Sequence, residues 1–102
     1  MSYENIKTVF DLAAAFGSLR RSSEKRPDLH PDVEAELKAL VTRNCEVLRE
    51  YRREDDGRLM DYCRGTGVSI ETLYRIEGGD LAGVPLDDIE AVLDTYASGY
   101  CS

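Results

Sequence analysis

The side chains able to carry catalysis or bind metal ions are few in this sequence, and their spacing suits neither role. The single histidine, His30, lies in a polar stretch before a predicted helix, and we interpret it as a helix-start residue rather than a catalyst. The three cysteines stand at no spacing typical of metal ligands: Cys45, Cys63 and Cys101. Reduced thiols are expected, with Cys45 and Cys63 as small buried apolar residues. The sequence predicts no metal site and no cofactor.

The other polar clusters also have non-catalytic explanations. Ser22–Ser23 has no recognisable general base nearby in the sequence. The carboxylate pairs Asp55–Asp56 and Asp87–Asp88 lie at predicted helix ends, where capping explains them. The glycine-containing segments 65–67 and 78–79 lack the strand–glycine–helix context of a phosphate loop. We therefore expect no enzyme.

Charge is distributed unevenly along the 102 residues, whose net charge is −7. Residues 43–76 contain seven of the 13 basic residues, all arginine, balanced by seven acidic residues. Residues 77–102 contain six acidic residues and no basic one. The net charge excludes an indiscriminate binder of polyanions, because an acidic protein repels phosphate. An arginine-rich, locally neutral middle segment remains able to face DNA while the acidic end points away.

The elements that must position these arginines are predicted to be helices. Apolar residues follow a helical period over about residues 3–22, and a polar linker follows at 22–28. A second, longer helix is expected from Pro31 or Asp32 to Arg53 or Glu54, ended by Gly57. Its two-sided apolar stripe indicates two packing partners: the domain core, and either the first helix or another subunit.

Three short helices are expected after this, at about 58–65, 69–77 and 85–97, and no strand is expected. The sequence predicts one all-α domain over 1–102, with residues 1–30 as an N-terminal helix and linker and a candidate dimerisation element. No apolar run is long enough to span a membrane, and no secretory signal is visible, so a cytoplasmic protein is expected.

The segment 59–79 carries the most information. Two helices that cross at a steep angle need a small residue four before the turn glycine, which here is Cys63 before Gly67. Gly67 tolerates a positive φ, Val68 is suited to the core, and Ser69 is a good N-cap. Leu73 and Ile76, three residues apart, are expected to face the core.

This pattern resembles the helix-turn-helix of the Cro and phage-repressor (XRE-like) family. The resemblance covers about residues 44–97, from a first helix with an Arg-bearing end, through Arg75-Ile76-Glu77-Gly78, to a helix at 85–93. It implies a compact five-helix, lambda-repressor-like domain with its core in 31–98, in which the N-terminal helix fills the fifth place. Thr66 departs from the pattern, which usually has an apolar residue there, and Gly65 weakens the first of the two crossing helices.

The resemblance implies a dimeric, repressor-type regulator of transcription that binds double-stranded DNA. The second crossing helix would lie in the major groove. Its base-reading candidates are Ser69, Ile70, Glu71, Thr72, Tyr74 and Arg75. The phosphate-contact candidates are Arg49, Arg52, Arg53, Arg58 and Arg64.

Other roles for the same residues stay open. A salt-bridged, solvated helix face explains the arginines about as well as DNA does. Glu77 is expected to form an ion pair with Arg49 or Arg52. Tyr74 fits a base contact, an interface anchor or a half-buried core position equally well. The alternative function is an acidic protein-binding module on the same scaffold: an anti-activator, an antitoxin-like partner or a phage-encoded inhibitor. The stripe from Ile6 to Leu19 would then be a helix-in-groove element.

Overall fold

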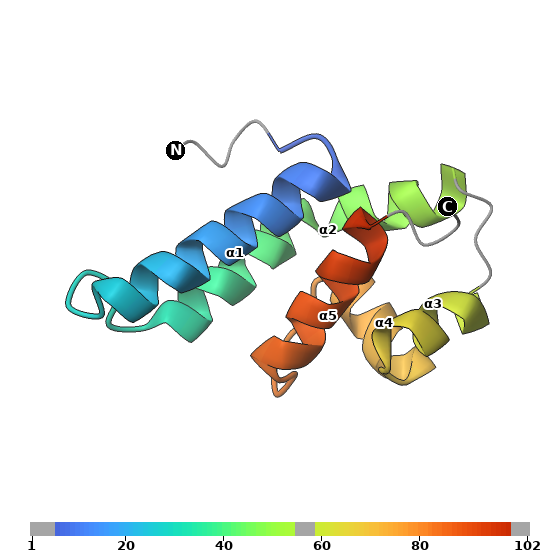
Figure 1. The fold of residues 1–102 in the computed structure, drawn as a ribbon. Coiled ribbons are helices and arrows are strands. Elements are labelled where there is room, and N and C mark those ends of the chain that lie inside the picture. The colour runs from blue at the N-terminus through green and yellow to red at the C-terminus, as the bar shows by residue number, and fades with distance from the viewer. Residues whose placement is uncertain (1–5, 55–58, 99–102) are drawn as a thin grey trace.

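Five α-helices and no strand make up the residues that the computed structural model describes, 6–54 and 59–98 (Figure 1). The helices are α1 (Val9–Lys25), α2 (Val33–Glu54), α3 (Leu59–Thr66), α4 (Ile70–Glu77) and α5 (Leu86–Ala97). The predicted all-α class and the number of helices are confirmed. Some residues that were given a role above lie outside the described residues: Asp55, Asp56, Gly57, Arg58 and Cys101.

Helix α1 lies further along the chain than predicted. It begins at Val9 because Thr8 is its N-cap: the Thr8 hydroxyl oxygen accepts from the backbone N–H of Asp11 at 3.1 Å. It ends at Lys25 rather than about residue 22, so the start of the predicted polar linker is helical. Ser23 lies in this extension, where it is buried and its hydroxyl donates to the Arg20 carbonyl oxygen at 2.7 Å.

Helix α2 begins at Val33, within two residues of the predicted start at Pro31 or Asp32. It ends at Glu54, which is one of the two predicted ends. Asp32 precedes it as the cap, with its carboxylate accepting from the Ala35 N–H at 3.3 Å. Figure 1 shows α1 and α2 side by side as an antiparallel hairpin. The two-sided stripe of α2 therefore has its second partner within the chain, because α2 packs on α1 and on α4.

The core lies where α1, α2, α4 and α5 meet. Its largest fully buried side chains include Phe16 of α1, Leu37 of α2, Leu73 of α4 and Tyr96 of α5. The inner side of α5 is formed by the buried Ile89, Val92, Leu93 and Tyr96 and by the partly buried Leu86. Four residues of the apolar stripe of α1 are likewise buried within the chain: Val9, Leu12, Phe16 and Leu19. Phe10 is exposed, so this part of α1 is left to contact another molecule.

Three residues connect α3 to α4, and they have the predicted roles. Gly67 has φ of 76°, which favours glycine, and Val68 is buried. The hydroxyl group of the buried Thr66 has two hydrogen-bond partners in the backbone. It donates to the Cys63 carbonyl oxygen and accepts from the Val68 N–H, both at 3.3 Å. This explains how a polar residue occupies a position where an apolar one was expected.

Polar side chains of two residues, Thr95 and Arg20, connect α5 to α3 and to α1. The Thr95 hydroxyl of α5 donates to the Gly65 carbonyl oxygen of α3 at 3.2 Å. Arg20 of α1 pairs with Asp87 at 2.9 Å and Glu90 at 3.2 Å, both on α5. The hydrogen bond to Asp87 and the charge of Glu90 raise the pKa of Arg20 above its ordinary value. None of the described helices is both long and apolar enough to cross a membrane.

Candidate functional site

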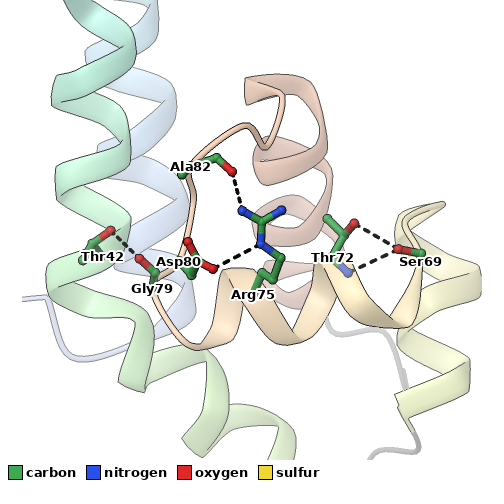
Figure 2. Close-up of polar contacts among 7 residues, drawn as sticks. All are labelled: Thr42, Ser69, Thr72, Arg75, Gly79, Asp80 and Ala82. Carbon is green, nitrogen blue, oxygen red and sulfur yellow. Dashed lines mark hydrogen bonds and ion pairs between the residues drawn. The ribbon is translucent and has the colours of Figure 1, made fainter.

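Helix α4 is held so that one side packs on the core and the other faces solvent. Ser69 caps its start: the Ser69 hydroxyl oxygen accepts from the Thr72 N–H at 3.2 Å and lies 3.0 Å from the Thr72 hydroxyl (Figure 2). Leu73 and Ile76 are fully buried, as their spacing predicted. The opposite side of this eight-residue helix is the candidate functional surface.

Four residues form the outward side of α4, which we call the outer face: Ile70, Glu71, Tyr74 and Arg75, all exposed. Ile70 is 37% exposed and Tyr74 is 56% exposed. Tyr74 is therefore a surface residue, so the half-buried core position is excluded for it. Ser69 is exposed as well, and Thr72 is half-buried beside it. The structure thus brings all six base-reading candidates onto one helix and its cap, with four of them on the outer face.

The end of α4 is anchored through Glu77. Its carboxylate is almost fully buried and accepts from Nε and Nη2 of Arg52 at 2.8 and 2.9 Å. The Tyr96 hydroxyl donates to the same carboxylate at 2.6 Å. The bidentate hydrogen bonding to Glu77 raises the pKa of Arg52 above its ordinary value. The predicted ion pair of Glu77 is confirmed with Arg52, and Tyr96 is an additional partner.

The loop after α4 is fixed to α2 at Gly79. The Thr42 hydroxyl donates to the Gly79 carbonyl oxygen at 3.1 Å (Figure 2). Gly79 has φ of 80°, and a Cβ at this position would lie 3.3 Å from Sγ of Cys45. Glycine is therefore required here both for the backbone conformation and for the close approach to α2. Cys45 and Cys63 are only partly buried, which corrects the expectation that both are core residues.

Arg75 is directed toward the loop between α4 and α5. Its Nε donates to the Asp80 carboxylate at 3.3 Å, and its Nη2 donates to the Ala82 carbonyl oxygen (Figure 2). The side chain is still 42% exposed. The guanidinium therefore occupies a fixed place beside the outer face, with part of its donor capacity already used.

The phosphate-contact candidates have different environments. Arg49 and Arg53 are exposed on α2, on either side of Arg52, and form no ion pair with any described residue. Arg52 is paired with Glu77 through Nε and Nη2, so part of its donor capacity is already used within the chain. Arg64 is exposed near the end of α3. Arg58 falls outside the part of the chain that the structure describes.

Several contacts of this site had no clear sequence signal. Tyr96 and Glu77 are 19 residues apart, and Thr42 and Gly79 are 37 apart, so only the fold brings each pair together. The Arg75–Asp80 pair is only five residues apart across a helix end, so its spacing could have suggested it.

Within the described ranges, no group of three or more His, Cys, Asp or Glu side chains is arranged to hold a metal ion.

Comparison with known proteins adds no relative: no protein-family model, no curated protein and no solved structure matches this chain.

Proposed function

We propose that this chain is a small helix-turn-helix regulator of transcription that binds double-stranded DNA through α4 as a homodimer. The observation that carries the proposal is a short helix anchored at its C-terminal end by Glu77 and Gly79, with its capped N-terminal turn and outer face in solvent. Helices of this type read bases from their N-terminal turn.

The dimensions and groups of α4 fit a major groove. Eight residues extend about 12 Å at about 1.5 Å per residue, close to the width of the groove. The Thr72 side chain is suited to a thymine methyl group or a base edge. Glu71 accepts from cytosine N4, and Arg75 donates to guanine or phosphate. Arg49 and Arg53 carry the positive charge left for phosphate on α2, and Arg64 adds a cation on α3.

A salt titration of selected DNA tests this proposal. Sites selected from a random duplex library should bind with an affinity that falls with salt, because each phosphate contact releases counterions. Three contacts per protomer make six per homodimer, which predicts a slope of about −5 in log affinity against log salt. Arg49→Ala removes one contact from each protomer and should flatten the slope by about 2 for every sequence, whereas Thr72→Ala should relax preference at one base position of each half-site.

The matched control for Arg49→Ala is Arg21→Ala. Arg21 is an exposed arginine on α1, and its replacement changes the net charge equally. The slope of Arg21→Ala should equal that of the parent chain. Failure to shift any selected duplex at 50 mM salt would refute DNA binding.

A second candidate function is docking of α4 against another protein. The observation that favours it is the exposed pair Ile70 and Tyr74, four residues apart on the outer face, together with the commitment of Arg75 to its own loop. Aromatic and aliphatic side chains placed in this way act as anchors at protein interfaces. The net charge of −7 is compatible with a basic groove on such a partner.

The variant Ile70→Ser separates the two functions. If α4 docks against another protein, Ile70→Ser should lower the affinity for that partner at least tenfold, with little dependence on salt. DNA binding should retain its salt slope in this variant, because Ile70 contributes no charge.

A further inference from the structure

The turn between α1 and α2 brings together three side chains that the sequence analysis treated separately. Nδ1 of His30 lies 2.8 Å from Oε2 of Glu36, and Nε2 of His30 lies 3.4 Å from Oγ of Ser22. Ser22 comes from α1 and Glu36 from the first turn of α2. The Leu29 N–H donates to the Arg26 carbonyl oxygen at 3.0 Å and the His30 N–H to that of Pro27 at 3.2 Å, which places His30 between the helices.

The contacts fit one tautomer of the His30 ring. A carboxylate oxygen accepts hydrogen bonds, and the tautomer with its hydrogen on Nδ1 donates to Glu36. Nε2 is then the acceptor, and it faces the Ser22 hydroxyl. A serine beside an imidazole that a carboxylate orients is the arrangement of an activated nucleophile, and the serine–histidine distance is often longer before substrate binds.

A cavity adjoins two of these residues. Its volume is about 490 Å³, and His30 and Glu36 form part of its wall, whereas Ser22 does not line it. The rest of the wall is apolar, from Leu19 of α1 and from Ala35, Ala39 and Leu40 of α2, except for the cationic Arg43. Ser22 follows Leu19 by three residues, so both lie on the same side of α1. The volume lies within the range of small-molecule sites.

We infer that Ser22, His30 and Glu36 form a nucleophilic serine site that cleaves small esters with a short apolar acyl chain. The Ser22 oxygen attacks the ester carbonyl carbon while Nε2 of His30 takes the hydroxyl proton. The C–O bond to the alcohol breaks, and His30 returns that proton to the departing oxygen. Water then attacks the acyl-serine in the same way. The acid leaves, Ser22 regains its hydroxyl, and the net reaction consumes one ester and one water.

This site is separate from the proposed DNA surface. Figure 1 shows the α1–α2 turn at the end of the hairpin that is remote from α3 and α4. The two activities are therefore expected to be separable by mutation.

Covalent labelling tests the inference. The full chain is treated with a fluorophosphonate probe and mapped by peptide mass spectrometry, and hydrolysis of p-nitrophenyl butyrate is followed in parallel. One adduct is expected, at Ser22, and Ser22→Ala should abolish it. His30→Gln should slow both labelling and hydrolysis by about 100-fold. Glu36→Gln should slow hydrolysis at least tenfold, because it removes the charge that stabilises the imidazolium.

Ser18→Ala is the matched control, because it makes the same chemical change one turn earlier on α1. It should label and hydrolyse as the parent chain does. Far-ultraviolet circular dichroism of every variant establishes that it is folded. The inference is overturned by an unlabelled Ser22 under conditions that fully label a reference serine hydrolase. It is equally overturned by labelling at Ser22 that His30→Gln leaves unchanged.

Discussion

The buried carboxylate of Glu77 allows a sharp prediction about stability. Arg52→Ala removes two of its three hydrogen bonds, those at 2.8 and 2.9 Å, and leaves the 2.6 Å bond from Tyr96. The Glu77 side chain is 3% exposed, so water does not replace the lost donors. Breaking a buried pair by removing one partner costs about 3–5 kcal/mol. The Arg52 side chain is 26% exposed and part of its charge is already solvated, which places the expected loss near about 3 kcal/mol.

Urea denaturation followed by circular dichroism at 222 nm measures this loss. With a slope of about 1.5 kcal/mol per molar urea, a loss of about 3 kcal/mol lowers the midpoint by about 2 M. Tyr96→Phe removes one hydrogen bond to a charged group and should cost less, about 1.5–2 kcal/mol. The double variant Arg52→Met with Glu77→Leu should recover most of the loss, because no uncompensated charge remains buried.

The matched control is Arg53→Ala, the neighbouring arginine on α2, which is exposed. It should change the free energy of unfolding by less than about 0.5 kcal/mol. A midpoint for Arg52→Ala within about 0.5 M of the parent would refute the reasoning, since it would mean that Glu77 reaches other donors or water.

Three further predictions concern packing, pH and association. Gly79→Ala should destabilise the fold by about 1–2 kcal/mol from backbone strain, and by more from contact with Cys45. Gly83 is also at positive φ but has open space around it, so Gly83→Ala should show the strain alone in urea denaturation. Desolvation of its carboxyl group and the charge of Glu90 raise the pKa of Asp94, so the folded chain holds that proton more tightly and loses stability as the pH rises from the ordinary aspartate value of about 3.9 through the raised value. Asp94→Asn should therefore be more stable than the parent at pH 7 and equal to it below about pH 3, and an equal difference at both pH values would contradict this assignment. Phe10 is 62% exposed beside a hollow of about 270 Å³ that Val47 and Tyr51 also line, so Phe10→Glu should convert the proposed homodimer to a monomer in light scattering, with unchanged mass as the contrary result.

Helical periodicity predicted the fold well because most of the apolar side chains at helical spacing pack in the core. The spacing of Leu73 and Ile76 predicted the buried side of α4, and Gly67 and Ser69 predicted the turn before it. The boundaries of α1 were less predictable, because Thr8 and Ser23 act through local side-chain hydrogen bonds that periodicity does not register.

The candidate sites were only partly accessible from sequence. Charge and spacing pointed to the pair of Glu77 with an arginine of α2, but Tyr96 joins them through packing of α5 against α4. Arg52, a phosphate candidate, has two of its donors bonded to Glu77, and sequence does not distinguish an exposed arginine from its paired neighbour one position away. The Ser22–His30–Glu36 arrangement depends on the geometry of the turn at 26–30, for which the sequence carries no distance information.

The anchoring of α4 has a consequence for its motion. Its last turn is fixed to α2 and α5 through Glu77 and Gly79, whereas its first turn is held by its own cap at Ser69. The first turn is also joined to α3 by three residues, of which Val68 is buried in the core. Adjustment of the outer face to a binding surface therefore requires α3 and the first turn of α4 to move together, while the last turn keeps its place.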